Sequence, residues 1–283
     1  TGMEDVAPIL DHDPAAVEVR DDVLRDLARE TAEFAPVVDI LPENTDSTLL
    51  VEFYADSIAD GKQKVANLLA DRLPSYESAV DASSDRITTD GPVNATDALE
   101  AYDDDRQAKF WKMRKAGLPI LLSRTSDAKH WPFIEDTAVP AENLPEYVND
   151  IQTLFEEYDT FASYYAHAGP GVLHIRPLLN LKSEDGLETM EAISEAITDL
   201  VIEYDGSVSG EHGDGRARTQ WNHKLYGDEL WETFKQLKTA FDPDWLLNPG
   251  QVVFRETNPN HMTDNLRFDP EYQFDAGFEP DLE

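Results

Sequence analysis

Residues 161–179, FASYYAHAGPGVLHIRPLL, alternate in side-chain character on both sides of the turn signal Gly169-Pro170-Gly171. Alternation around such a turn predicts a β-hairpin. His167 and His174 flank the turn, seven residues apart, so we expect their imidazoles on neighbouring strands and on one face. The hairpin therefore predicts an antiparallel sheet that carries two histidines side by side.

The segments around the hairpin show strand and helix patterns in turn. Apolar runs predict further strands at 48–55, 118–124 and 131–140. Apolar residues at helical spacing predict helices at 13–34, 60–73, 95–117, 141–159, 183–206 and 227–241. This order predicts an α+β fold, with helices on one face of a mainly antiparallel sheet and two ferredoxin-like halves. We assign residues 1–254 to this domain, with 1–45 as a helical lead-in, and 255–283 to a polar tail or linker.

Acidic residues outnumber basic residues along the whole chain. The 58 aspartates and glutamates against 23 lysines and arginines give a formal net charge of −35. Because this charge repels polyanions, we exclude nucleic acids and anionic membranes as binding partners. The acids are spread over the sequence rather than gathered in a tail, so we expect a halophilic protein whose self-repulsion is screened by concentrated salt.

The sequence contains no cysteine. The chain therefore offers no disulfide, no thiolate nucleophile and no ligand for an iron–sulfur cluster. No apolar run approaches the ~20 residues of a membrane span, and residues 1–10 lack the pattern of a signal peptide. We expect a soluble, cytoplasmic protein.

Residues 209–218, SGEHGDGRAR, combine three glycines with both acidic and basic side chains. Glycines at this density indicate a backbone that bends sharply or approaches another group closely. Glu211 is a candidate third ligand beside His167 and His174, since two imidazoles and one carboxylate bind a divalent cation and leave one position open. His212 is then a candidate for proton transfer. By spacing alone, two histidines on a hairpin are more often hydrogen-bonded structural groups than metal ligands.

The histidine pair, the SGEHG motif and residues 241–253, FDPDWLLNPGQVV, occur in the order and spacing of a known family. From about residue 45 to 254 the chain resembles the C-terminal substrate domain, or cap domain, of the FAD-linked oxidases. That family includes D-lactate dehydrogenase, D-2-hydroxyglutarate dehydrogenase and the glycolate oxidase D subunit. The resemblance implies oxidation of a 2-hydroxy acid such as D-lactate or glycolate, with hydride passing to flavin.

The resemblance also implies a role for several residues. It places a zinc or manganese ion on His167, His174 and Glu211, where the metal would hold the substrate hydroxyl and carboxylate. It makes His212 the base that takes the hydroxyl proton. It assigns binding of substrate carboxylates to Arg114 and Lys129, the first of which suits a bidentate carboxylate contact.

Three positions depart from the family pattern. Pro170 and Val172 stand where the family has aspartate and asparagine between the histidines, and Leu118 stands where it has threonine. These differences leave the identity of the substrate open. Arg176, two residues after His174, is a candidate to occupy the space of the missing amide and to favour an acidic substrate.

The family binds FAD mainly through an N-terminal domain that this sequence does not show. We therefore expect the chain to carry the substrate half of a longer polypeptide, with Asn248 near the flavin. Residues 262–274 resemble variants that continue into an iron–sulfur module, so we expect electrons to pass from flavin to an iron–sulfur or quinone acceptor. That acceptor would place the protein at the periphery of a membrane.

Two other classes of function remain open at this point. The chain is also consistent with a non-catalytic ferredoxin-like module that binds a small carboxylate. It is likewise consistent with a structural domain whose histidines only brace the hairpin. Convergence of His167, His174 and Glu211 on one point is the feature that separates the metal-site hypothesis from both.

Overall fold

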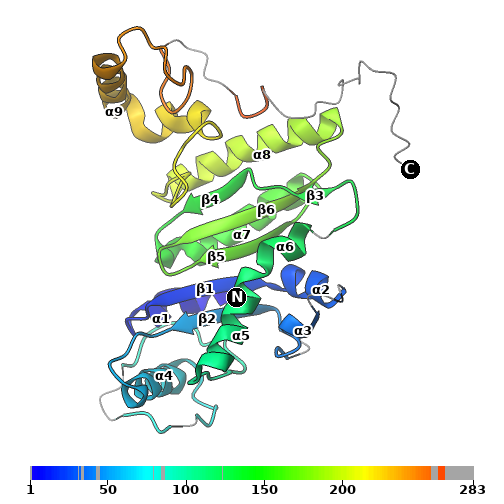
Figure 1. Cartoon of the computed structure of the whole chain (residues 1–283), viewed down its shortest axis with the longest axis vertical. Coiled ribbons are helices and arrows are strands. Elements are labelled where there is room, and N and C mark those ends of the chain that lie inside the picture. Colours follow the sequence, from blue (N-terminus) through cyan, green and yellow to red (C-terminus); the bar gives the residue numbers. More distant parts are fainter. Residues whose placement is uncertain are drawn as a thin grey trace.

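The computed structural model describes residues 2–30, 32, 35–42, 45–78, 80–83, 87–122, 124–255 and 261–264. It is built around one antiparallel sheet with helices packed on it (Figure 1). The strands are β1 (Ala16–Asp21), β2 (Ser47–Glu52), β3 (Lys129–His130), β4 (Ile134–Ala138), β5 (Ala162–His167) and β6 (Val172–Leu179). The α+β class and the antiparallel sheet predicted from the sequence are confirmed.

The strand order is β2-β1-β5-β6, and both β3 and β4 pair with the remaining edge of β6. The hairpin predicted at 161–179 forms β5 and β6, with His167 opposite Val172 and Tyr165 opposite His174. Gly171 closes the turn at a φ of 76°, where a Cβ would lie 1.8 Å from the Val139 carbonyl oxygen. Only glycine fits this position.

Eleven helical segments are described. They are the 3-10 helices η1 (Gly2–Asp5) and η2 (Ala141–Asn143), and α1 (Val6–Leu10), α2 (Asp22–Glu30), α3 (Ala35–Val38), α4 (Ile58–Arg72), α5 (Asp104–Lys115), α6 (Gly117–Leu122), α7 (Leu144–Glu157), α8 (Glu184–Glu203) and α9 (Thr219–Phe241). Gly227 interrupts α9 with a φ of 71°. Among the described residues, no helix has the length and apolar character needed to cross a membrane.

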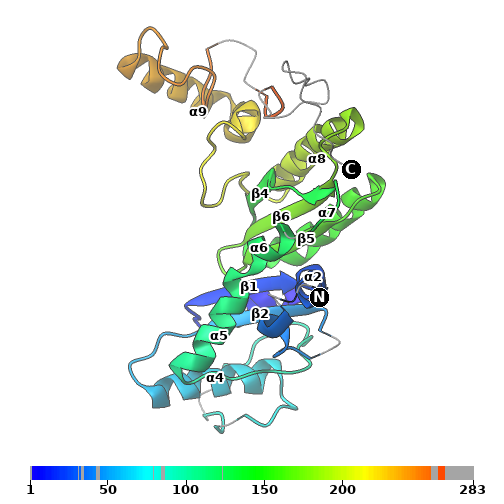
Figure 2. The ribbon, with the colours of Figure 1, turned by 45° about the vertical axis from the view of Figure 1, so that its right-hand side comes forward.

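The main core lies between one face of the sheet and α1, α7 and α8. Figure 2 shows α7 and α8 beside β5 and β6. Val17 and Val19 of β1 and Leu173 and Ile175 of β6 point into it, because alternate residues of a strand share a face. A smaller apolar cluster on the opposite face joins Tyr165 of β5 to α2, α3, α5 and α6. That opposite face also carries the polar side chains of β1, β5 and β6.

The order β4-α7-β5-β6-α8 matches the first five elements of a ferredoxin-like βαββαβ unit. After α8 the chain returns to the sheet, where Ser207 bridges Ala138 of β4. This return brings residues 209–218 to the end of the sheet beside the β5–β6 turn, which is how the glycine-rich motif reaches the histidines.

The helical lead-in predicted for residues 1–45 is wrong at its centre. Residues 16–21 form β1, the strand between β2 and β5, and only Asp22–Glu30 continue as α2. The sequence AVEVRD alternates apolar and charged residues, a pattern typical of a strand. Pairing of both edges of β1 with neighbouring strands stabilises the strand over the predicted helix.

Two other predicted elements also differ from the structure. The strand predicted at 118–124 is wrong where it is described, because Gly117–Leu122 form α6, with Ile120 and Leu121 buried against α2. The helix predicted at 95–117 begins only at Asp104, whose N-cap Asp103 accepts a hydrogen bond from the Arg106 backbone N–H. The tail at 255–283 lies mostly outside the described residues.

Candidate active site

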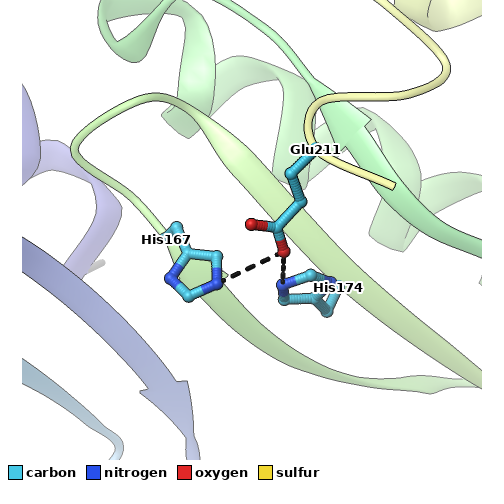
Figure 3. A group of neighbouring side chains, drawn as sticks. All are labelled: His167, His174 and Glu211. Carbon is cyan, nitrogen blue, oxygen red and sulfur yellow. Dashed lines mark ion pairs between the residues drawn. The ribbon is translucent and has the colours of Figure 1, made fainter. Parts of the chain in front are cut away.

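His167 and His174 lie side by side on the sheet face opposite the main core (Figure 3). Their rings are 5.2 Å apart between centroids and nearly perpendicular. Glu211 reaches them from the glycine-rich loop: its Oε1 lies 3.4 Å from His167 Nε2 and 3.4 Å from His174 Nε2. Two strands and a loop more than thirty residues downstream thus meet at one point.

The spacing of these three groups fits a metal ion. Their ligand atoms all lie within 4.8 Å of one another. Ligands held about 2.0–2.2 Å from a tetrahedral zinc are about 3.3–3.5 Å apart, close to the two nitrogen–oxygen distances seen here. The ligand atoms of a second group, Asp136, Glu211 and His212, also lie within 4.8 Å of one another. The carboxylate of Asp136 already accepts three hydrogen bonds, so the first group is the better ligand set.

The other ring nitrogen of each histidine has a partner that directs Nε2 towards Glu211. His167 Nδ1 lies 2.7 Å from Glu18 Oε1, and His174 Nδ1 donates to the Glu135 carbonyl oxygen at 2.5 Å. Metal-binding histidines usually make such a contact through the nitrogen that does not bind the metal. The donor set and its orientation therefore fit a divalent cation.

Different surroundings shift the two histidine pKa values in opposite directions. The hydrogen bond to Glu18 raises the pKa of His167 against the effect of burial. Burial lowers the pKa of His174 to about 4, so its imidazole is neutral near pH 7, the form that binds metal. Burial raises the pKa of Glu18, but hydrogen bonds from His167 and Arg114 outweigh it and keep the carboxyl ionised.

Asp136 of β4 fixes the glycine-rich loop. Its carboxylate accepts hydrogen bonds from the Ser209 hydroxyl and from the backbone N–H groups of Glu211 and His212, at 2.7, 3.0 and 2.9 Å. Gly210 donates its N–H to the Asp136 carbonyl oxygen at 2.7 Å. A Cβ on Gly210 would lie 2.6 Å from Val172 Cγ2, so the close approach requires glycine.

His212 lies beside this group rather than apart from it. Its ring stacks on His174 at 5.6 Å between centroids, and its Nε2 lies 3.2 Å from Glu211 Oε1. Its Nδ1 lies 3.5 Å from Glu135 Oε1, and its side chain is 42% exposed. The imidazole therefore lies at the open side of the site, where a molecule bound to His167, His174 and Glu211 can contact it.

Arg114 and Arg176, two of the predicted substrate-binding residues, also lie at the site. Arg114 of α5 pairs with Glu18 and places Nη2 3.3 Å from His167 Nδ1. Arg176 of β6 pairs with Glu135 at 2.5 Å and donates to the Tyr165 hydroxyl at 2.5 Å. Both guanidiniums lie 5.5 Å from the centre of the Tyr165 ring.

Lys129 and Asn248 are not brought to this group. Lys129 pairs with Leu179, five residues from His174 along β6, or about 16 Å at a strand rise of about 3.3 Å. Its ammonium donates to the Arg124 carbonyl oxygen. Asn248 is exposed in the turn after α9, with a φ of 44°. The structure thus places Lys129 away from the histidines, and its binding of a substrate carboxylate and the flavin contact of Asn248 both stay predictions.

Sequence reasoning missed Glu18 as a part of the site. Glu18 was assigned to a helix, although the alternation in AVEVRD at 16–21 is a strand signal. For Glu135 and Asp136, the sequence favours a strand end whose acids hold a loop by hydrogen bonds, and Asp136 does hold residues 209–212 in this way. Which loop they hold is set only by the return of the chain after α8.

Residues 1–252 match the family described as FAD linked oxidases, C-terminal domain. The chain belongs to this family. FAD-linked oxidases of known function are among its relatives: the chain is 28% identical over 237 residues to a D-2-hydroxyglutarate dehydrogenase of Haemophilus influenzae and 30% identical over 241 residues to that of Escherichia coli K12. It is 32% identical over 161 residues to the glycolate oxidase subunit GlcD of the same E. coli strain.

The family match extends over much of this chain but over a small part of these relatives. The two dehydrogenase alignments cover 84% of the chain and 22% of each relative, and the GlcD alignment covers 57% of the chain and 32% of the relative. The structure of a 4-ethylphenol oxidase from Gulosibacter chungangensis is also similar, with a TM-score of 0.52 and 13% identity over 90% of this chain and 52% of that one. This last similarity supports the fold.

Proposed function

We propose that this chain forms the substrate half of a flavin-dependent enzyme that oxidises a 2-hydroxy acid, such as D-lactate or glycolate. The observation that carries the proposal is the convergence of His167 Nε2, His174 Nε2 and Glu211 Oε1 on the polar face of the sheet. Relatives that are named as 2-hydroxy-acid dehydrogenases or as a glycolate oxidase subunit support it.

His167, His174 and Glu211 would hold a divalent metal, zinc or manganese. When bound, such a metal polarises the substrate and lowers the pKa of its 2-hydroxyl group. FAD, held mainly by another domain of the same polypeptide, is the hydride acceptor when bound. We propose that Asn248 lies near the flavin, and that an iron–sulfur or quinone acceptor takes electrons from the flavin.

The chain's own side chains would bind the acid and move one proton. Arg114 presents a planar guanidinium beside His167 and suits the substrate carboxylate. His212 Nε2 would accept the proton of the 2-hydroxyl, since this imidazole lies at the exposed side of the group, 3.2 Å from Glu211 Oε1. Arg176, held by Glu135 and Tyr165, would add positive charge next to the bound acid.

Metal analysis of purified protein tests the proposal. We expect close to one equivalent of zinc or manganese in the parent protein and its loss in His167→Ala and Glu211→Ala. Glu195→Ala is a matched control, because Glu195 is a carboxylate of α8 that pairs with Lys224 away from the site. In the flavin-loaded polypeptide the two site variants should also lose oxidation of 2-hydroxy acids. Metal content unchanged by both substitutions would overturn the proposal.

A further inference from the structure

Glu135 of β4 contacts three residues of the candidate site, each through a different oxygen. Its backbone carbonyl accepts a hydrogen bond from His174 Nδ1 at 2.5 Å. Its carboxylate Oε2 pairs with Arg176 Nη2 at 2.5 Å, and its Oε1 lies 3.5 Å from His212 Nδ1. One residue thus links a candidate metal ligand, a candidate substrate-binding arginine and the candidate base.

An irregularity of β4 brings this carboxylate to His212. The pairing of β4 with β6 shifts register between Ile134 and Thr137, where three steps along β4 oppose two steps along β6. Successive side chains of a regular strand point to opposite faces. Here Glu135 reaches the ring of His212, and Asp136 accepts a hydrogen bond from the backbone N–H of the same residue at 2.9 Å. Bulges next to active sites commonly redirect a side chain in this way.

The contact with Glu135 determines which nitrogen of His212 can accept a proton. A neutral imidazole carries one N–H and one lone pair, and only the lone pair takes up a proton. A carboxylate beside Nδ1 favours the hydrogen at that nitrogen, which leaves the lone pair on Nε2. This Nε2 lies 3.2 Å from Glu211 Oε1 and so faces the group where the 2-hydroxyl would bind. Arg176 holds the other carboxylate oxygen, which fixes the direction of Oε1.

We propose that Glu135 is a positioning residue for the oxidation of the 2-hydroxy acid and acts through His212. Its carboxylate holds the imidazole with the hydrogen on Nδ1 and the lone pair of Nε2 directed at the substrate. The inference rests on the proposed function and adds to it the group that orients the base.

The oxidation step then balances as follows. The O–H bond of the 2-hydroxyl breaks and its proton forms an N–H bond at His212 Nε2, while hydride leaves C2 with two electrons for FAD and a 2-oxo acid remains. The imidazole gains a positive charge in this step. The Glu135 carboxylate stabilises that charge across the Nδ1–H, as in other carboxylate–histidine pairs.

Steady-state kinetics of the flavin-loaded enzyme test the inference, with D-lactate, glycolate and D-2-hydroxyglutarate as substrates. In Glu135→Gln the amide oxygen can still accept from Arg176, but an NH2 group replaces the acceptor beside Nδ1. We expect kcat to fall about 10- to 100-fold, a part of the about 10²- to 10⁴-fold that a general base contributes, with KM within about threefold of the parent. Glu142→Gln, exposed in η2 after the same strand, should leave both values unchanged.

A double-substitution cycle shows whether Glu135 acts through His212. In the His212→Gln background, Glu135→Gln should lower kcat by less than about twofold, because the residue that it positions is already gone. A further fall as large as in the parent background would show that Glu135 acts independently of His212 and would overturn the inference. Glu135→Asp keeps the carboxylate on a shorter side chain and should give an intermediate kcat. It replaces Glu135→Gln in the cycle if that variant has a lower Tm.

The tautomer of His212 gives a readout that needs no flavin. Nitrogen-15 NMR of the imidazoles, with zinc added and at about pH 8, distinguishes N–H from lone-pair nitrogens, and the His212→Gln spectrum identifies the ring. We expect the hydrogen on Nδ1 in the parent and a mixture of tautomers in Glu135→Gln. The metal content should stay that of the parent, because the backbone carbonyl still accepts from His174. A hydrogen on Nε2 in the parent, or loss of metal in Glu135→Gln, would overturn the inference.

The outcomes separate this inference from the function on which it rests. Oxidation of a 2-hydroxy acid by the parent enzyme, with kcat unchanged in Glu135→Gln, would overturn the role of Glu135 and leave the proposed function intact. Failure of the parent holoenzyme to oxidise any of the three acids would overturn the proposed function, and the inference with it.

Discussion

Glu18 Oε1 lies 2.7 Å from His167 Nδ1, although the two residues are 149 positions apart in the chain. The contact orients Nε2 of His167 towards Glu211 and joins the first strand of the sheet to the candidate metal site. It also places Arg114, which pairs with the other oxygen of Glu18, beside the same histidine.

Removal of this carboxylate should weaken metal binding without removing a ligand. We expect Glu18→Gln to lower zinc affinity about 10- to 100-fold, because the histidine loses the partner that orients it. Competition with a chromophoric chelator measures the affinity. Glu52→Gln is the control, since Glu52 lies on the neighbouring strand and accepts a hydrogen bond from Trp111. Equal affinities in both variants would show that Glu18 does not position His167.

His212 should affect turnover rather than metal content. In the flavin-loaded enzyme we expect His212→Gln to lower kcat about 10²- to 10⁴-fold, because the proton acceptor is lost. The metal content and the KM of the substrate should stay close to those of the parent. A variant that turns over at nearly the parent rate would rule out His212 as the base.

Gly210→Ala should disturb the loop that carries Glu211. The added methyl would lie 2.6 Å from Val172 Cγ2 and 3.2 Å from Ala138 Cβ, inside van der Waals contact. We expect a loss of about 1–3 kcal/mol in the free energy of unfolding, measured by urea titration, together with weaker metal binding. Gly61→Ala in α4, where the new Cβ meets only Ala55 at 3.4 Å, should be neutral or stabilising. Equal stabilities would mean that the loop adjusts without cost.

Asp21 should make the free energy of unfolding depend on pH. Burial raises its pKa to about 6, even though the Tyr164 and Leu24 N–H groups and the Ser163 hydroxyl donate to it. The folded state therefore holds a proton between about pH 4 and 6 that the unfolded state has released, so stability falls as pH rises through that window. The loss amounts to about 2–3 kcal/mol.

Measuring the free energy of unfolding against pH in variants separates the contribution of Asp21 from those of the many other carboxylates. The stability of Asp21→Asn relative to the parent should rise by about 2–3 kcal/mol from pH 4 to pH 6.5, because the amide does not ionise. Asp26→Asn, at an exposed position on the following helix α2, is the surface control. A flat pH profile of the stability difference between Asp21→Asn and the parent would contradict the raised pKa of Asp21.

Salt should stabilise the fold by screening its net charge of −35. The Debye length falls from about 10 Å at 0.1 M salt to about 3 Å at 1 M, so repulsion between surface carboxylates is largely removed at molar KCl. We expect Tm to rise steadily between these concentrations. Sucrose at matched osmolality controls for solute exclusion. Equal stability at 0.1 and 2 M KCl would contradict the halophilic expectation.

Local sequence patterns determined the parts of this protein that depend on near neighbours in the chain. The Gly-Pro-Gly turn and its flanking alternation predict the β5–β6 hairpin, and with it the shared face of His167 and His174. The motif SGEHG supplies a carboxylate and an imidazole on a glycine-rich backbone. These signals act over a few residues, where turn geometry and side-chain alternation leave few alternatives.

Only the tertiary structure decided which distant segments complete the site. Residues 16–21 are a strand because β2 and β5 pair with both of its edges, and this places Glu18 beside His167. The bridge from Ser207 to Ala138, with the hydrogen bonds to Asp136, brings Glu211 to them. No short-range pattern contains these pairings, because burial and cross-strand hydrogen bonds outweigh local propensity only once the whole sheet has formed.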